Sequence, residues 1–416
     1  MPAGVVDVRG HALGQPRPAD RNGSDGRPLS TPARRVSGHY VRQPTGYRAY
    51  IPAPLPPDPP VAVDAARLAH ASEALARLNA IATQQPFVAG FAAMCLRREA
   101  VLSARIEGVR ATLADLLAWE LDPATPGLPA DVQDAANIAA ALRYAPARLA
   151  DLPLSLRLLR EIHALVLRGP AGEGKTPGEF RRSQNWVGPP GATLATAAFV
   201  PPPPGELLAA LGQLEAYMHT VDDTPPLVRI ALVHAQFETV HPFLDGNGLV
   251  GRVLIQVMLQ QQGVLRLPLL YLSLAFRMRL PDYEAGLAAT REGDWERWLD
   301  FFLAAIESAA YDVDVTAQAV GRLVDQHRAL LAGQPPVTTD LRVLGLLTER
   351  PLLDAAAVGQ ALALSSHAAD AALSRLESIG IVTRLANGQY QYTAYLRWFQ
   401  ELGELPAGGI VHLERW

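Results

Sequence analysis

The chain has 416 residues, of which 49% are hydrophobic and 19% are charged, and its formal net charge is −4. This length and composition predict a globular protein of two or three domains. The single cysteine, Cys95, excludes an internal disulfide and a cysteine-based zinc site, and the negative charge argues against a general polyanion binder. Because there is neither a membrane-length apolar run nor a secretory signal pattern, we expect a soluble cytoplasmic protein with no membrane contact.

The character of the sequence changes near residue 50. Residues 1–50 are rich in Gly, Pro, Ser and Arg without a hydrophobic period, which predicts a disordered tail. A Pro-rich stretch at 51–60 is expected to be extended. From Ala62 onward, apolar residues recur at three- and four-residue spacing, so we expect 51–150 to be an amino-terminal helical region. Helices are predicted around 72–79 and over 91–114, 131–148 and 154–168.

Two later segments depart from this helical pattern. Residues 182–204 contain short extended pieces around a Gly/Pro turn, which predicts a hairpin or flap, and helices resume over 205–320. Beyond Gly333-Gln-Pro-Pro, the pattern of 335–416 is typical of a winged-helix domain, with an Asn-Gly hairpin signal. We expect its three helices and two strands at 339–350, 354–363, 366–379, 381–385 and 389–393.

The segment most informative about chemistry is residues 241–252, with the sequence HPFLDGNGLVGR. A helix over 227–239 should end near Pro242, because proline disfavours a helical conformation in the residue before it. The glycines then allow a tight loop before a second helix at 249–262. A glycine-rich loop that leads into a helix amino terminus presents backbone N–H groups to phosphate. Arg252 lies on the first turn of this helix and should point back toward the same anion site.

Two further side chains complete this loop. Asp245 has the hard oxygen ligands that Mg²⁺ prefers in phosphate complexes. His241 has an ordinary pKa near 6.5, which suits a general base. The loop therefore combines a base, a metal ligand, an anion cradle and a cation.

These residues resemble the signature of the Fic family, His-x-Phe-x-Asp/Glu-Gly-Asn-Gly-Arg-x-x-Arg, at all but one of its fixed positions. The segments Pro177-Gly-Glu-Phe-Arg-Arg-Ser-Gln-Asn-Trp-Val-Gly and Phe199-Val-Pro-Pro-Pro-Pro resemble the family's flap region. Asp282-Tyr and Gly293-Asp-Trp-Glu-Arg-Trp are similar to its carboxy-terminal helices. The resemblance covers roughly 52–309. It implies a mainly α fold, a Fic-type helical bundle with a small β-hairpin flap and a catalytic core at 151–325, plus the carboxy-terminal winged helix.

The resemblance implies transfer of AMP from ATP to a Ser, Thr or Tyr hydroxyl of a target protein. In that scheme His241 deprotonates the hydroxyl, Asp245 binds Mg²⁺, and Arg252 contributes a phosphate-binding cation. The loop residues Gly246, Asn247 and Gly248 would stabilise phosphate oxygens. Flap residues at about 193–200 would align the target strand. The other nucleotide-binding residues implied are Phe243, Gly251 and Tyr283, the last matching the first of a family Tyr pair whose second member is Glu284 here.

One position departs from the family pattern. Leu249 stands where the family has its first Arg, so one phosphate-facing cation is missing. We expect reduced but retained AMP transfer; a different nucleotide donor and a bias toward the reverse reaction are the alternatives.

A regulatory motif is also implied. Ser103-Ala-Arg-Ile-Glu107-Gly108 resembles the family's inhibitory motif, Ser/Thr-x-x-x-Glu-Gly/Asn. A Glu107 carboxylate that reaches Arg252 would take the cation meant for the γ-phosphate. The family precedent also lets this Glu position water for the removal of AMP.

The carboxy-terminal module raises a second function. Its expected recognition helix offers His367, Ser374 and Arg375 to DNA, but 337–400 carries five Arg and five acidic residues, and specific DNA binders rely on several phosphate contacts. We therefore favour protein docking or homodimerisation for this module. The alternative hypothesis is a DNA-binding transcriptional regulator whose inactive Fic module only senses nucleotide.

Overall fold

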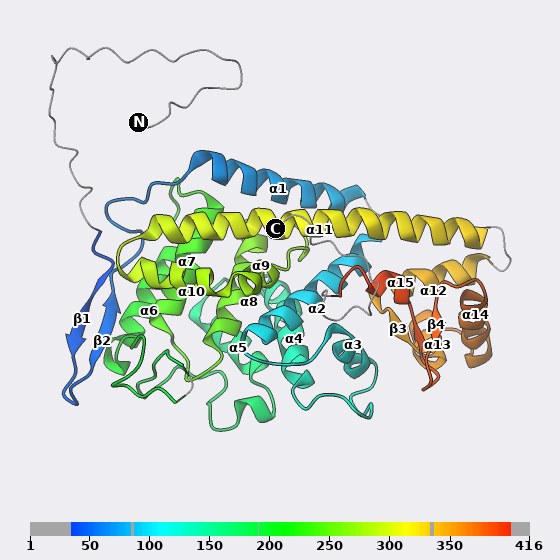
Figure 1. Cartoon of the computed structure of the whole chain (residues 1–416), viewed down its shortest axis with the longest axis horizontal. Coiled ribbons are helices and arrows are strands. Elements are labelled where there is room, and N and C mark those ends of the chain that lie inside the picture. Colours follow the sequence, from blue (N-terminus) through cyan, green and yellow to red (C-terminus); the bar gives the residue numbers. More distant parts are fainter. Residues whose placement is uncertain (1–34, 85–86, 190, 333–336, 401–416) are drawn as a thin grey trace, which may run out of the picture. The chain divides into compact units, whose positions relative to one another are not determined.

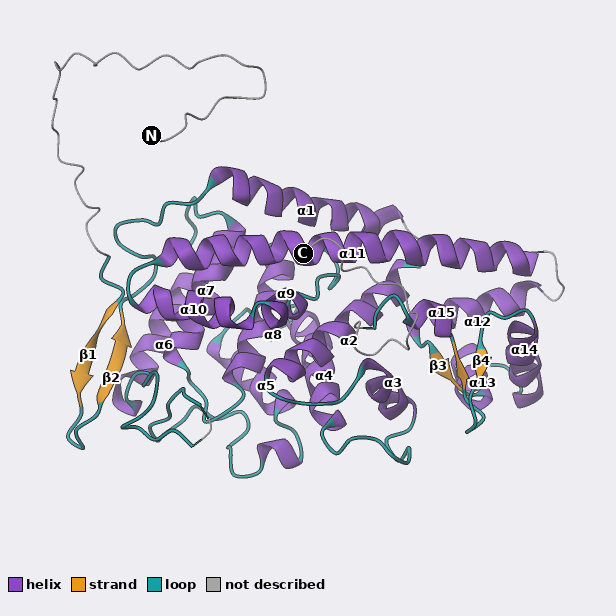
Figure 2. Ribbon diagram, in the orientation of Figure 1, coloured by secondary structure: helices purple, strands orange, loops and turns teal. Residues whose placement is uncertain are grey.

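The computed structural model describes residues 35–84, 87–189, 191–332 and 337–400, and most of these residues are helical, as Figures 1 and 2 show. The expectation of a mainly α fold is confirmed. Residues 1–34 of the predicted disordered tail lie outside the described residues.

The predicted tail does not extend to residue 50. Strands β1 (Gly38–Arg42) and β2 (Arg48–Pro52) pair antiparallel. An isolated two-stranded hairpin is marginal, and tertiary contacts support this one: Tyr50 is buried, and its hydroxyl donates to the Arg291 carbonyl at 3.1 Å. Composition alone failed here because these partners lie far away in the sequence.

The amino-terminal region forms four helices: α1 (Ala65–Gln84), α2 (Val88–Ile106), α3 (Leu113–Leu121) and α4 (Val132–Arg148). The single helix expected over 91–114 is divided into α2 and α3. Gly108 has a φ of 89°, which ends the helical path. A capping box of Thr112 with Asp115 then starts α3. The break places Glu107 at the carboxyl end of α2.

The central region contributes α5 (Leu156–Val166), the 3₁₀ helix η1 (Pro170–Gly172), α6 (Pro204–Met218), α7 (Pro226–Val240), α8 (Asn247–Gln261), α9 (Ser273–Met278), α10 (Leu280–Arg291) and α11 (Trp295–Ala332). Nearly every residue of α7 and α8 is buried. Helix α11 ends at Ala332 rather than near Val320, and it runs beside α1 in Figure 1. The helical pair α7–α8 therefore lies in the core and fixes the loop between them.

The flap differs from the expected hairpin. Val187 and Phe199 form a single antiparallel bridge with hydrogen bonds of 2.8 and 3.1 Å. Thr196 closes a turn on Thr193, so 193–200 is not an extended strand. Prolines at 189 and 201–204 lack the N–H groups that a longer ladder needs.

The carboxy-terminal module comprises α12 (Val337–Glu349), β3 (Leu352–Leu353), α13 (Ala355–Leu362), α14 (Ser366–Ser378), β4 (Thr383–Arg384), β5 (Tyr390–Gln391) and α15 (Thr393–Leu396), and its sheet has the order β3-β5-β4. Strand β3 was not expected. Arg375, predicted as a DNA contact, instead pairs through two nitrogens with buried Asp340 at 2.9 and 2.6 Å. Ser374 contacts the Tyr390 hydroxyl at 3.5 Å. Two of the three predicted DNA contacts therefore serve internal packing.

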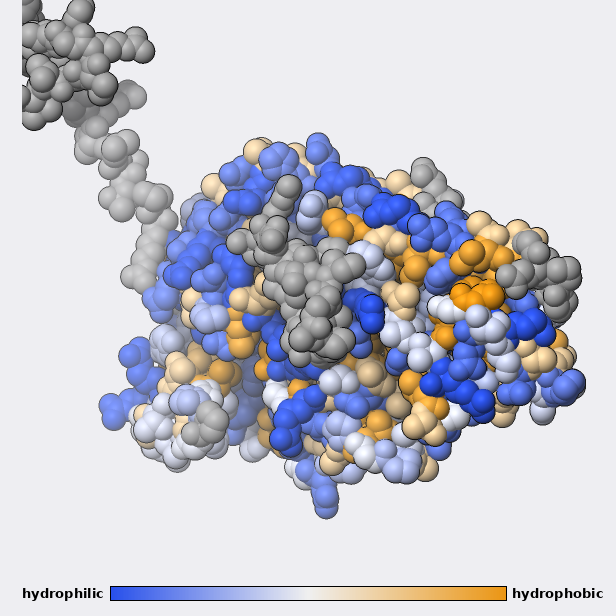
Figure 3. Space-filling view, turned by 45° about the vertical axis from the view of Figure 1, so that its right-hand side comes forward, coloured by the Kyte–Doolittle hydropathy of each residue, from blue (hydrophilic) through white to orange (hydrophobic). Residues whose placement is uncertain are grey.

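The surface carries hydrophilic and hydrophobic residues. Figure 3 shows one face, on which hydrophilic residues are interspersed with smaller hydrophobic areas. Within the described ranges, no helix is long and apolar enough to cross a membrane.

Candidate active site

The loop between α7 and α8 is sharply turned at both ends. His241 closes α7 with φ 48° and ψ 63°, and Gly246 precedes α8 with φ 72°. A left-handed conformation is unusual for a histidine, so the contacts around His241 have to stabilise the turn at this residue. Pro242 blocks continuation of the helix, as the sequence predicted.

Asn247 closes this loop upon itself. Its Oδ1 accepts from the Phe243 N–H at 2.9 Å, and its Nδ2 donates to the Phe243 carbonyl, also at 2.9 Å. Asn185, from the flap region, donates to the same carbonyl at 2.7 Å. Because Asn247 is 2% exposed, its amide shapes the loop in addition to any contact with a ligand.

The His241 imidazole is held by the same two amides. Its Nδ1 lies 3.0 Å from Asn185 Nδ2 and 3.2 Å from Asn247 Nδ2. Amide –NH₂ groups only donate, so Nδ1 accepts and the ring proton lies on Nε2. Burial, followed by the nearby Arg181 charge, lowers the His241 pKa to about 4, so the ring is neutral at pH 7.

Arg181 is a supporting residue that sequence reasoning missed. Its Nε donates to the His241 carbonyl at 2.9 Å, and its Nη2 donates to the Pro202 carbonyl at 2.6 Å and to the Val240 carbonyl at 3.3 Å. The side chain is 3% exposed. It thereby satisfies the carbonyl groups at the end of α7, which the helix itself leaves without partners.

His163 on α5 is a second missed residue. Its ring stacks on Phe243 with centroids 3.8 Å apart. Nδ1 accepts from the Gly178 N–H at 2.8 Å, and Nε2 donates to the Asp245 carbonyl at 3.1 Å. Burial lowers its pKa to about 4. One neutral imidazole thus joins the loop to the segment around Gly178.

Asp245 faces solvent at the mouth of the loop. Its Oδ1 accepts from the Gly246 N–H at 2.8 Å, and its Oδ2 forms an ion pair with Lys175. The carboxylate is 51% exposed. A single accessible carboxylate suits Mg²⁺, which typically takes one or two carboxylates and completes its shell with phosphate oxygens and water.

The segment from Ser103 to Gly108 reaches Arg252. The Arg252 Nη2 lies 2.7 Å from Glu107 Oε1, and its Nε donates to Ser103 Oγ at 2.8 Å. A Cβ at Gly248 would lie 2.5 Å from the same Glu107 oxygen, so a larger residue there would displace the carboxylate from its present position. The predicted regulatory residues and the predicted cation therefore meet, although α2 and α8 are far apart in the sequence.

Comparisons with known proteins agree with this geometry. The model of the Fic/DOC family matches residues 153–259, and the model of the Fic/DOC family N-terminal region matches residues 65–147. The protein adenylyltransferase Fic of Aedes aegypti is 31% identical over 195 residues, which are 43% of this chain and 36% of that protein. Its Culex quinquefasciatus counterpart is 30% identical over 195 residues, 43% and 35% of the two chains.

The chain therefore contains Fic/DOC family sequence over residues 65–147 and 153–259. It spans about a third of the length of these curated relatives. Two solved structures share the Fic fold: a Fic family protein from Desulfovibrio desulfuricans has a TM-score of 0.53 at 22% identity, over 80% of this chain and 98% of that one. A Fic domain containing signaling protein from Bacteroides thetaiotaomicron has a TM-score of 0.50 at 19% identity, over 61% and 97%.

Three residues that the Fic resemblance placed at the nucleotide are closely packed in this structure. Phe243 is fully buried against His163, and Tyr283 is 4% exposed with its hydroxyl 2.8 Å from His234 Nε2. Gly251 packs against α7, where its carbonyl contacts His234 Nδ1 at 3.1 Å. All three contribute packing or hydrogen bonds around the loop, and their contact with a nucleotide stays a prediction.

Leu249 and the flap also differ from what the Fic resemblance implies. Leu249 is 8% exposed and belongs to the core. At this position an apolar side chain that packs in the core therefore stands where the family has a positively charged arginine. In the flap, Phe199 is paired with Val187, and the Val200 carbonyl accepts from the Tyr50 N–H of β2 at 2.9 Å. Both edges of the segment at Phe199–Val200 are occupied, so the predicted pairing with a target strand is not available there.

Proposed function

We propose that this chain transfers AMP from ATP to a Ser, Thr or Tyr hydroxyl of a protein, itself included. The observation that carries the proposal is the loop 241–252, where a neutral histidine, an exposed carboxylate and a helix amino terminus adjoin one another. The names of the curated relatives support the same reaction.

In the proposed reaction, the target oxygen bonds to the α-phosphorus while the bond from that phosphorus to the bridging oxygen breaks, and pyrophosphate leaves. His241 accepts the hydroxyl proton, a role typically worth ~10²–10⁴ in rate. Backbone amides at the start of α8 face the phosphate oxygens. Mg²⁺, when bound at Asp245, supplies positive charge to the phosphates.

Two features of the structure oppose the proposed reaction: the tautomer of His241 and the ion pair between Glu107 and Arg252. With its proton on Nε2, His241 needs the other tautomer before Nε2 can accept a proton, and that change breaks the amide contacts to Nδ1. Glu107 meanwhile occupies Arg252, the cation proposed for the γ-phosphate. We infer autoinhibition by Glu107, and we assign to the same carboxylate the positioning of water for removal of AMP.

The test uses ATP labelled at the α-phosphate, with Mg²⁺. Glu107→Gly should incorporate more label into protein than the unchanged chain, and Glu107→Gly combined with His241→Ala should incorporate none. Transfer of a γ-label would point to phosphorylation instead. Absence of α-label from the Glu107→Gly protein, with itself and a cell lysate as targets, would refute AMP transfer.

A further inference from the structure

The only lysine of the chain, Lys175, lies against the carboxylate proposed to bind magnesium. Its Nζ pairs with Asp245 Oδ2, while the other oxygen of that carboxylate accepts the Gly246 N–H. The ammonium group and the first amide of the anion loop therefore share one carboxylate. Lys175 is 43% exposed, so solvent and a ligand can both reach it.

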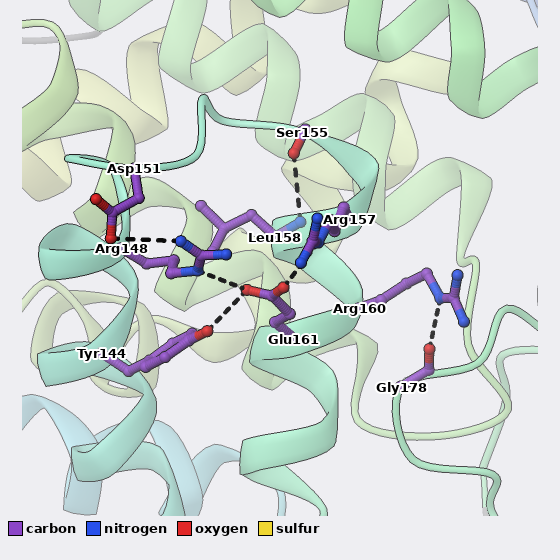
Figure 4. Close-up of polar contacts among 9 residues, drawn as sticks. All are labelled: Tyr144, Arg148, Asp151, Ser155, Arg157, Leu158, Arg160, Glu161 and Gly178. Carbon is purple, nitrogen blue, oxygen red and sulfur yellow. Dashed lines mark hydrogen bonds and ion pairs between the residues drawn. The ribbon is translucent and has the colours of Figure 1, made fainter.

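The segment that carries Lys175 is anchored to α5. The Gly178 N–H donates to His163 at 2.8 Å, and Arg160 donates to the Gly178 carbonyl at 2.6 Å, a contact drawn in Figure 4. The Lys175 N–H donates to the Gly172 carbonyl at 3.0 Å. Because His163 also contacts the Asp245 carbonyl, one side chain sets the distance between the lysine segment and the anion loop.

Of the positive charges around the loop, two are already committed to other groups. Leu249 supplies none, Arg252 is bound to Glu107 and Ser103, and Arg181 is committed to backbone carbonyls. Lys175 adds a positive charge at the mouth of the loop, on a flexible stem that can reorient. Its present partner, Asp245, is the group that a bound divalent cation would neutralise.

We propose that Lys175 is a phosphate-binding residue that supplies part of the positive charge lost with the arginine absent at 249. With Mg²⁺ held at Asp245, Lys175 would lose its present carboxylate partner and its ammonium group would be free to contact a phosphate oxygen of the nucleotide. The ligand class is a nucleoside polyphosphate with a divalent cation. This inference rests on the proposed nucleotide site, but it does not require that AMP be transferred.

The experiment measures binding of ATP and of adenosine by calorimetry in Mg²⁺, in a Glu107→Gly background that frees Arg252. Lys175→Met should weaken ATP binding by roughly three- to tenfold, the range for an accessible charge-assisted contact, and should leave adenosine binding unchanged. Lys175→Arg should recover most of the loss. Arg157→Met, which removes an exposed charge from α5 (69% exposed), is the matched control and should bind both ligands normally.

Two outcomes would overturn the proposal. If Lys175 only neutralises Asp245, Lys175→Met will bind ATP with Mg²⁺ equally well or more tightly. Equal weakening of ATP and adenosine would indicate damage to the loop instead of a lost phosphate contact. Failure of AMP transfer with the predicted binding pattern intact would count against the proposed function and leave this assignment standing.

Discussion

Two residues at the anion loop, Arg252 and Leu249, set the positive charge available to bind the phosphates of a nucleotide. Arg252 is present but bound by Glu107, and the family's other arginine is replaced by Leu249, whose side chain is 8% exposed within the core. Charge-assisted contacts with phosphate are the stronger kind of hydrogen bond. The replacement therefore lowers the expected affinity for the transition state without disturbing the fold.

Restoring the missing charge tests this view. Leu249→Arg in the Glu107→Gly background should raise the rate of AMP incorporation by ~10-fold or more, because such a contact is worth ~1.5–3 kcal/mol. The rate of labelled AMP incorporation at saturating ATP is the measurement. Leu249→Met, which keeps an apolar side chain of similar volume, should change little. An unchanged rate in the arginine variant, with normal thermal stability, would remove the argument.

At the scale of elements, α5 connects the anion loop to the lysine segment through His163. Helix α5 is itself fixed to α4 by Glu161, which accepts from Tyr144 at 2.7 Å and from Arg148 at 3.3 Å (Figure 4). His163 is fully buried, and both its ring nitrogens are hydrogen-bonded to backbone groups. The site geometry therefore depends on a helix that carries none of the motif residues.

The buried His163 also predicts a pH dependence. Its pKa is about 4 in the folded protein and about 6.5 when unfolded, so only the unfolded state binds the proton between these values. Stability is unaffected above pH 6.5 and falls as pH drops toward 4. For this group the loss is ~2 kcal/mol at pH 5.

Replacing His163 should remove this contribution. In urea unfolding at pH 7.5 and pH 5, His163→Gln should lose ~2 kcal/mol less on acidification than the unchanged protein. Other groups contribute equally to both proteins and cancel in the difference. His219→Gln, at the exposed end of α6, is the control and should behave like the unchanged protein. An identical pH response of all three proteins would contradict the buried neutral state of His163.

At the scale of the molecule, α2 joins the carboxy-terminal module to the candidate active site. Ser103 and Glu107 at one end of α2 bind Arg252, and at the other end Gly90 packs against Thr348 of α12. Arg97, between them, donates to the Glu349 carbonyl at 2.8 Å. The residues proposed to inhibit the reaction and the residues that contact the module thus lie on or at the end of one helix.

The close approach at Gly90 predicts opposite effects for two matched substitutions. A Cβ at Gly90 would lie 2.5–2.7 Å from Thr348 atoms, two of them backbone, whereas a Cβ at Gly212 on α6 would meet nothing within 4 Å. Gly212→Ala should stabilise the protein by ~0.5–1 kcal/mol through helix propensity. Gly90→Ala should destabilise it by ~1–3 kcal/mol through overpacking. Thermal melts measure both, and equal shifts of the same sign would refute the contact.

The sequence by itself determined the features that depend on neighbouring residues. Apolar spacing predicted the central helices, Pro242 ended α7, and the motif from His241 to Arg252 specified the anion loop and the Fic family. The meeting of Glu107 with Arg252 was also anticipated, but only through the family resemblance. These features follow from local backbone preferences and from a motif that is short and contiguous.

Tertiary packing decided the rest. The β1–β2 hairpin depends on Tyr50 contacting the flap and α10, and the burial of Phe243 and Tyr283 depends on which helices surround them. The partners of Asp245 lie 70 residues away at Lys175 and 82 residues away at His163. Such pairs arise because folding places distant segments side by side, and no local pattern in the chain encodes which segments those are.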